Sequence, residues 1–162
     1  MELTYENLVK WFDGYFEDVR KNQGDLKTVP NLRKYFTPDL ELMMYTAPSA
    51  PPAKAMSRDA LLISFVHPGL QEDIVPHYYA IDLAKMIVAV QFEILFHDKP
   101  SGKTWPPLQA SAHYHLVIDK NKELKIKRIL YWTEALPGDL FEYWAKHREE
   151  ALTAHALGYI NQ

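Results

Sequence analysis

Histidine is the residue type in this sequence best suited to acid–base chemistry near neutral pH. The chain has 162 residues and contains seven histidines, at positions 67, 77, 97, 113, 115, 147 and 155. An imidazole can donate or accept a proton at this pH without a special environment. His77 opens a segment rich in β-branched and aromatic residues, and His97 closes a long alternating run within it. Both sites fit strand ends at a barrel mouth, so the two form a candidate catalytic pair. A hydrogen-bonded structural role is the alternative for each.

Glu134 is a third candidate acid–base group. It follows the apolar strand end Leu130-Tyr-Trp-Thr. Apolar surroundings would raise the pKa of its carboxyl group towards neutrality by desolvation. The alternative is an ordinary surface glutamate at the end of a strand.

The sequence His113-Tyr-His115 places two imidazoles on one face of a strand, with Asp119 four residues further along the same alternation. Two histidines and one carboxylate can hold a metal ion. The spacing resembles the first cupin motif, but the bracketing glycines and the second motif are missing. The preferred interpretation is an exposed or interfacial strand face with no metal, and Tyr114 turned towards the core or a cavity.

Composition excludes several classes of function. Eighteen Lys and Arg against 21 Asp and Glu give a net charge of −3, which leaves no basic surface for nucleic acid or an anionic membrane. The absence of cysteine excludes disulfides, a thiolate nucleophile and cysteine-ligated metal. No glycine-rich phosphate loop, Gly-x-Ser-x-Gly elbow or His-Glu-x-x-His pair occurs, and we expect no cofactor. The N-terminal residues lack a signal-peptide pattern, so the expected location is cytoplasmic.

The first half of the chain is predicted to be mainly helical. Apolar residues recur at helical spacing over 5–23, and shorter helical segments are expected over 31–36 and 58–67. A strand is expected over 40–45, followed by a Pro/Ala-rich surface loop over 46–57. The length suits a single domain over 1–162.

The second half is predicted to form a β meander. Between residues 77 and 134, turn residues divide the chain into about four strands, and residues 87–96 alternate between an apolar set and a partly polar set. The alternation does not reveal which face is internal. A C-terminal helix is expected from about residue 139. The order of elements predicts an α+β fold, with a curved, mostly antiparallel sheet and helices gathered on one face.

Several segments together resemble the nuclear-transport-factor-2-like superfamily, and within it the SnoaL-like polyketide cyclases and scytalone dehydratase. These segments are the first helix ending in Asn22-Gln-Gly-Asp-Leu, Tyr35-Phe-Thr-Pro-Asp-Leu, Pro76-His-Tyr and Tyr131-Trp-Thr-Glu. The resemblance covers about residues 5–145. It implies a cone-shaped α+β barrel that encloses one deep pocket, often in a homodimer formed through the outer face of the sheet.

The resemblance also assigns roles to residues. His77 and His97 match the catalytic histidines of scytalone dehydratase, and Glu134 matches the acidic residue that SnoaL-like cyclases carry on the last strand. Two positions depart from the dehydratase, which has an aspartate where this chain has Asn22 and an asparagine nearest Tyr114. Ketosteroid isomerase is rejected, because the position of its base falls here near Met44 and Tyr45.

In this alignment, the side chains expected to line the pocket are Tyr15, Val19, Tyr45, Leu95, Tyr114, Leu130 and Trp132, with Phe141 and Trp144 covering the opening. Such a lining suits a small, flat, hydrophobic or aromatic molecule. Two functions are therefore expected as alternatives. One is a cofactor-independent lyase, cyclase or isomerase acting on an aromatic or polyketide-like ketone. The other is a non-catalytic dimeric small-molecule-binding module of the same fold.

Overall fold

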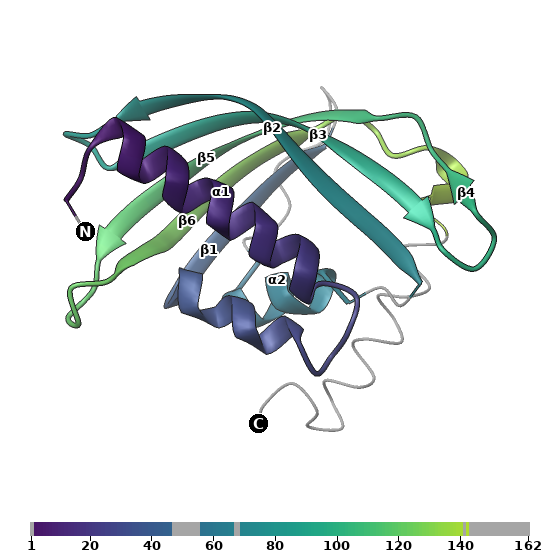
Figure 1. Ribbon diagram of the computed structural model, residues 1–162, viewed down its shortest axis with the longest axis horizontal. Coiled ribbons are helices and arrows are strands. Elements are labelled where there is room, and N and C mark those ends of the chain that lie inside the picture. The colour runs from purple at the N-terminus through teal and green to yellow at the C-terminus, as the bar shows by residue number, and fades with distance from the viewer. Residues whose placement is uncertain (1, 47–55, 67–68, 141, 143–162) are drawn as a thin grey trace.

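The computed structural model describes residues 2–46, 56–66, 69–140 and 142, and Figure 1 shows its architecture. Its elements in chain order are α1 (Tyr5–Asn22), the 3₁₀ helix η1 (Val29–Tyr35), β1 (Phe36–Thr46), α2 (Arg58–Ser64), β2 (Leu70–Asp82), β3 (Ile87–Asp98), β4 (Lys103–Thr104), β5 (Leu108–Ile118) and β6 (Leu124–Thr133). The predicted Pro/Ala loop and the predicted C-terminal helix lie largely outside the described residues. Within the described part, no helix is long and apolar enough to cross a membrane.

Helix α1 forms where the sequence predicted a helix over 5–23. Thr4 caps its N-terminus, because Thr4 Oγ1 accepts a hydrogen bond from the Asn7 amide at 3.2 Å. The chain then leaves the helix at Gly24, whose φ of 84° is accessible mainly to glycine. The helix buries one face of five residues against the sheet, namely Leu8, Phe12, Tyr15, Phe16 and Val19.

The sheet has the strand order β1-β6-β5-β3-β2, with β4 pairing with β3. All its pairs are antiparallel except β1 with β6, which is parallel. Figure 1 shows a strongly bent sheet, with α1, η1 and α2 gathered on its concave side. The predicted α+β fold is confirmed. The main difference is β2, which begins at Leu70 and not near His77 as the sequence suggested.

Alternation along β3 defines the two faces of the sheet. Its even-numbered residues from Val88 to Phe96 are buried against the helices, and its odd-numbered residues face the convex side. The register shifts in β2 between Pro76 and Tyr78 and in the β5/β6 pair next to Lys127, so each affected strand carries one extra residue there. These irregularities determine which side chains reach the interior.

Candidate functional site

A cavity of about 410 Å³ lies between the concave face of the sheet and the helices. Strands β1, β2, β3, β5 and β6 contribute to its wall, together with α1, α2 and the segment after β6. Its lining is mainly aliphatic and aromatic and comprises Tyr15, Leu42, Met44, Leu61, Ser64, Phe65, Glu72, Ile74, Phe92, Ile94, Phe96, Tyr114, Ile129, Tyr131, Thr133, Ala135, Leu136 and Leu140. A cavity of this size and character suits a small apolar ligand.

One carboxyl group lies in this apolar lining. Glu72 is the only acidic residue among the described lining residues, and none of them is a lysine, arginine or histidine. The other polar groups are hydroxyls, contributed by Tyr15, Tyr114, Tyr131, Ser64 and Thr133. The Ser64 hydroxyl donates to the carbonyl oxygen of Leu61 at 2.6 Å, so its proton is already used within α2. The cavity therefore combines one acidic group with three phenolic hydroxyls.

Local alternation places the Glu72 side chain. Leu70, Glu72 and Ile74 share the concave side of β2, and Glu72 pairs in register with Phe96 of β3. The side-chain amide of Gln23, at the end of α1, donates to the backbone carbonyl of Glu72 and joins the helix to this strand. Sequence reasoning missed Glu72, because the strand was expected to begin only near His77. The available signal was the spacing of Leu70 and Ile74 on either side of it.

The three tyrosines are held in their protonated form. Burial raises the pKa of Tyr15, and the nearby Glu72 carboxylate raises it further. The same two causes, in the same order, raise the pKa of Tyr131. Tyr114 is buried, and desolvation is the largest cause of its raised pKa. At neutral pH all three hydroxyls can donate hydrogen bonds, and phenolate formation is strongly disfavoured.

Aromatic packing holds Tyr15 in place. Its ring lies 5.1 Å from that of Tyr35 and 6.1 Å from that of Tyr114, both in edge-to-face geometry. The Tyr35 hydroxyl in turn donates to Asp18 Oδ2 at 2.7 Å. Tyr15 thus projects from α1 into the cavity with little freedom to move.

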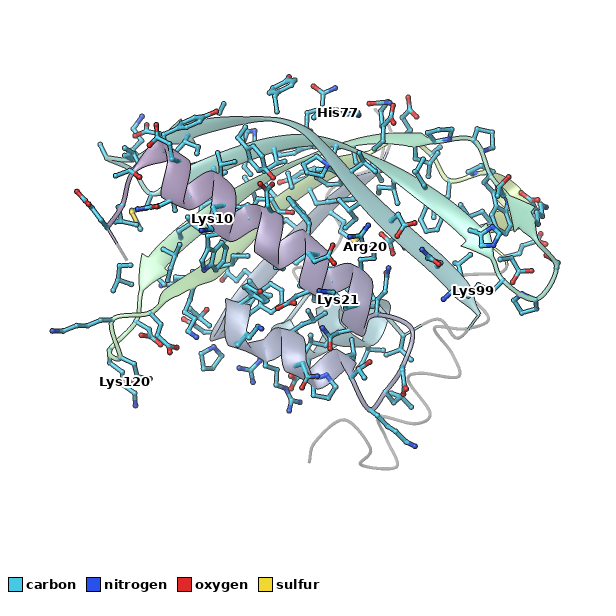
Figure 2. All side chains as sticks on the ribbon, viewed as in Figure 1. Lys10, Arg20, Lys21, His77, Lys99 and Lys120 are labelled. Atoms are coloured by element: carbon cyan, nitrogen blue, oxygen red, sulfur yellow. The ribbon has the colours of Figure 1, made fainter. Side chains whose placement is uncertain are left out.

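The three residues predicted to be catalytic do not line this cavity. His77 lies at the irregularity of β2, its side chain is 42% exposed, and its Nε2 is 3.6 Å from Glu93 Oε2. Figure 2 shows His77 on the side of the sheet away from α1. His97 shares the convex face with Glu93, because both are odd-numbered residues of β3. The structure therefore does not place these histidines among the residues that line the cavity, and their catalytic role stays a prediction.

Glu134 is connected to Glu93 through Gln109. Its Oε2 accepts a hydrogen bond from the Gln109 amide at 3.1 Å, and the Gln109 side chain donates to Glu93 Oε1 at 2.7 Å. A line of polar contacts therefore runs from His77 through Glu93 and Gln109 to Glu134. The neighbours Thr133 and Ala135 line the cavity, but Glu134 does not.

The predicted pocket lining is only partly matched. The cavity lining includes Tyr15 and Tyr114 but not Val19, which lies fully buried on the inner face of α1. Four further residues that were predicted to line the pocket do not line the cavity, namely Tyr45, Leu95, Leu130 and Trp132. Leu95 is 37% exposed, and the rings of Tyr45 and Trp132 stack on each other with centroids 5.2 Å apart. Phe141 and Trp144 lie outside the residues whose side chains are described.

The candidate metal ligands are engaged elsewhere. The ring of His113 lies 4.9 Å from that of Trp132. Burial lowers the pKa of His115, with further contributions from Arg128 and His113. Asp119 Oδ1 accepts hydrogen bonds from the amides of Asn121 and Glu123 at 2.8 and 2.9 Å, within its own turn. Among the described residues, no group of three or more His, Cys, Asp or Glu side chains is arranged to hold a metal ion.

Comparison with known proteins identifies the fold through solved structures of low sequence identity. No known family matches the sequence, and no curated protein matches it. ActVI-ORFA from Streptomyces coelicolor covers 80% of this chain and 96% of its own, at a TM-score of 0.55 and 16% identity. A Catenulispora acidiphila protein in complex with S-DNPA covers 80% of this chain and 92% of its own, at a TM-score of 0.53 and 17% identity. Nuclear transport factor 2 from Cryptosporidium parvum covers 76% of this chain and 89% of its own, at a TM-score of 0.56 and 14% identity. The chain therefore has the fold of the nuclear-transport-factor-2-like superfamily.

Proposed function

We propose that this protein is a cofactor-independent lyase, cyclase or isomerase that acts on an aromatic or polyketide-like ketone in its apolar cavity. The observation that carries the proposal is the carboxyl group of Glu72, which lines the same apolar cavity as the buried hydroxyls of Tyr15, Tyr114 and Tyr131. This arrangement suits chemistry at a carbon next to a carbonyl group. Such chemistry needs one base and one or more hydrogen-bond donors.

Glu72 is the base in this mechanism. Its carboxylate removes a proton from the carbon α to the ketone, and the electron pair of the broken C–H bond moves onto the ketone oxygen. The resulting enolate then accepts a proton at another atom, expels a leaving group or attacks an internal carbonyl. These three outcomes correspond to isomerisation, elimination and cyclisation. A positioned base contributes typically about 10²–10⁴-fold to the rate.

The tyrosine hydroxyls are the donors to the enolate oxygen. Their raised pKa values keep them protonated, so they stabilise developing negative charge by hydrogen bonding and keep their protons. Removal of one such donor typically costs about 10²–10³-fold in turnover.

A non-catalytic binding module is the second candidate. The observation that favours it is the position of the three sequence-predicted acid–base residues, His77, His97 and Glu134, outside the cavity. In this alternative, the hydroxyls and Glu72 only satisfy the polar groups of a bound molecule. The same fold supports both roles.

We also propose that two copies of the chain pair through the convex face of the sheet. Large apolar side chains remain accessible there, including Val75, Tyr78 and Leu95. The His77–Glu93 pair lies among them, so polar side chains are also available to an isologous partner. A stable pairing would bury about 800 Å² on each copy.

The test of the catalytic proposal uses α-proton exchange, which does not require the natural substrate. The protein is incubated in D₂O with a panel of neutral aromatic ketones such as 2-tetralone, and loss of the α-proton signal is followed by NMR. We expect accelerated exchange that falls about 10²-fold or more in Glu72→Gln. His97→Ala, which alters only the outer face, should retain the wild-type rate. Saturable binding across the panel without any exchange would support the binding module instead.

A further inference from the structure

A second cavity, of about 310 Å³, lies near the start of β2, the strand that carries Glu72. It occupies the junction of the end of α1, the start of β2 and the end of β3. Its lining is mainly polar and comprises Arg20, Gln23, Gly24, Asp25, Gly69, Leu70, Gln71 and Lys99. We call it the polar cleft. None of its lining residues also lines the apolar cavity.

Backbone hydrogen bonds hold the walls of the polar cleft together. The Lys99 amide donates to the Gly69 carbonyl at 2.8 Å, which extends the β2/β3 pairing beyond its last strand residues. The Gly24 amide donates to the Phe65 carbonyl at 2.7 Å and ties the end of α1 to the end of α2. Gly24 and Gly69 both have positive φ, at 84° and 86°. The shape of the cleft is therefore set by main-chain geometry that favours glycine at both turns.

Positive charge predominates among the side chains of the cleft. Arg20 and Lys99 come from different elements, and Figure 2 labels both near the junction of α1 and β2. Lys99 has no ion-pair partner among the described residues. Arg20 pairs with Glu17, but Glu17 is shared with Lys21, whose Nζ lies 3.1 Å from Glu17 Oε1. One carboxylate therefore serves two cations on this turn of the helix.

The one acidic residue of the cleft is partly engaged in its own turn. Asp25 Oδ1 accepts a hydrogen bond from the Lys27 amide at 2.8 Å, and the Asp25 carbonyl accepts from the Val29 amide at 2.9 Å. Its carboxylate thereby stabilises the loop that follows α1. Two cations from separate elements thus face one carboxylate that is already a hydrogen-bond acceptor.

We infer that the polar cleft binds a small organic anion through a carboxylate or phosphate group placed between Arg20 and Lys99. Guanidinium and ammonium groups are the side chains that bind such oxyanions most strongly. The volume leaves room for an organic body in addition to the anionic group. This site is separate from the apolar cavity, and its occupancy does not depend on the proposed catalytic role of Glu72.

Isothermal titration calorimetry with two probes, glycerol 3-phosphate and citrate, tests the inference. The two probes distinguish binding through a phosphate group from binding through a carboxylate group. We expect one binding site per chain for at least one probe, with affinity that falls as salt is raised. The preferred probe identifies phosphate or carboxylate as the ligand group. Lys99→Met and Arg20→Met should each weaken binding about tenfold, as the loss of one charge-assisted contact predicts.

Lys21→Met is the matched control. It removes one positive charge from the same turn of α1 and from the same acidic partner, but Lys21 does not line the cleft. Its affinity should stay within about twofold of wild type, since only the long-range field changes. Glu72→Gln should bind the probe as wild type does, even if the catalytic proposal fails. Thermal unfolding of each variant checks that the fold is retained.

Amide NMR gives a local readout of the same binding. On addition of the probe, the signals of Gly24 and Gly69 should shift, while those of residues in the β5/β6 turn, such as Lys120, should not. Two results would overturn the inference. One is the absence of binding by both probes, and the other is an equal loss of affinity in Lys21→Met and Lys99→Met, which would indicate diffuse charge attraction.

Discussion

Glu72 and Tyr15 face one cavity from a strand and a helix, and the carboxylate of Glu72 raises the pKa of the Tyr15 hydroxyl. Burial makes the larger contribution to this rise. A carboxylate and a phenol that influence each other in this way have complementary roles in acid–base chemistry. The carboxylate can accept a proton, and the phenol keeps its own proton and remains a hydrogen-bond donor.

Tyr15→Phe tests the donor role. The ring and its packing remain, so the variant should fold normally and bind a ketone with nearly unchanged KM. Turnover or α-proton exchange should fall about 10²-fold, because the donor acts mainly on the charge that develops in the transition state. Steady-state kinetics or NMR exchange rates measure the change.

Tyr35→Phe is the control for Tyr15→Phe. It removes a hydroxyl from the same aromatic cluster, but this hydroxyl bonds Asp18 at 2.7 Å and Tyr35 does not line the cavity. Its kcat should match that of wild type, with some loss of stability. Equal losses of kcat in the two variants would contradict the assigned role of Tyr15.

The charge of the cavity predicts ligand selectivity. Glu72 is the only charged side chain in the described lining, so an anionic ligand would lose hydration and meet a like charge. A neutral aromatic ketone should bind at least about tenfold more tightly than a carboxylate analogue of the same shape. In Glu72→Gln the difference should shrink. Calorimetric titration of the matched pair measures it, and tighter binding of the anion to wild type would contradict the prediction.

Much of the fold follows from patterns that are local in sequence. Apolar residues at helical spacing in α1 leave one face that can be buried, and the buried residues Leu8, Phe12 and Val19 lie on that face. The alternation of β3 likewise defines two faces from the sequence alone. Both patterns depend on periods of a few residues. In long helices and strands, tertiary contacts seldom change the secondary structure that such a period indicates.

The position of the site depends on information that alternation does not contain. In β6, Leu130 and Trp132 form one apolar set and Ile129 and Tyr131 the other, so hydrophobicity does not decide which set is internal. The irregularity beside Lys127 shifts the pairing with β5, and bending of the sheet makes only one face concave. Leu95 was assigned inward for the same reason and is partly exposed.

Pairing through the convex face predicts a dimer that one substitution disrupts. Leu95 is 37% exposed in the second half of β3, and an arginine there would place an unpaired charge in the interface. Wild-type protein should sediment as a dimer, and Leu95→Arg as a monomer with an unchanged circular dichroism spectrum. Leu83→Arg, in the β2/β3 turn and 42% exposed, is the control and should remain dimeric. A wild-type monomer at high concentration would contradict the proposed pairing.

Asp18 predicts an acid-dependent part of the stability. Hydrogen bonds from Lys34 and Tyr35 lower the pKa of its carboxyl group, with Lys34 Nζ at 2.6 Å and the Tyr35 hydroxyl at 2.7 Å. Because the pKa is lower in the folded state, this stabilisation is complete above the unfolded value of about 3.9. It is lost as the pH falls from there through the folded value.

Asp18→Asn should therefore lower the free energy of unfolding at pH 7 by about 1 kcal/mol. The difference from wild type should shrink as the pH falls below about 4, because Asp18 is then protonated in the unfolded state and its folded-state ionisation becomes less favourable. Urea denaturation at pH 7, 5, 4 and 3 measures this. Glu41→Gln removes an exposed carboxylate 3.8 Å from Arg128 and should change stability little at any of these pH values. A difference for Asp18→Asn that stays constant down to pH 3 would show that the charge of Asp18 is not what stabilises the fold.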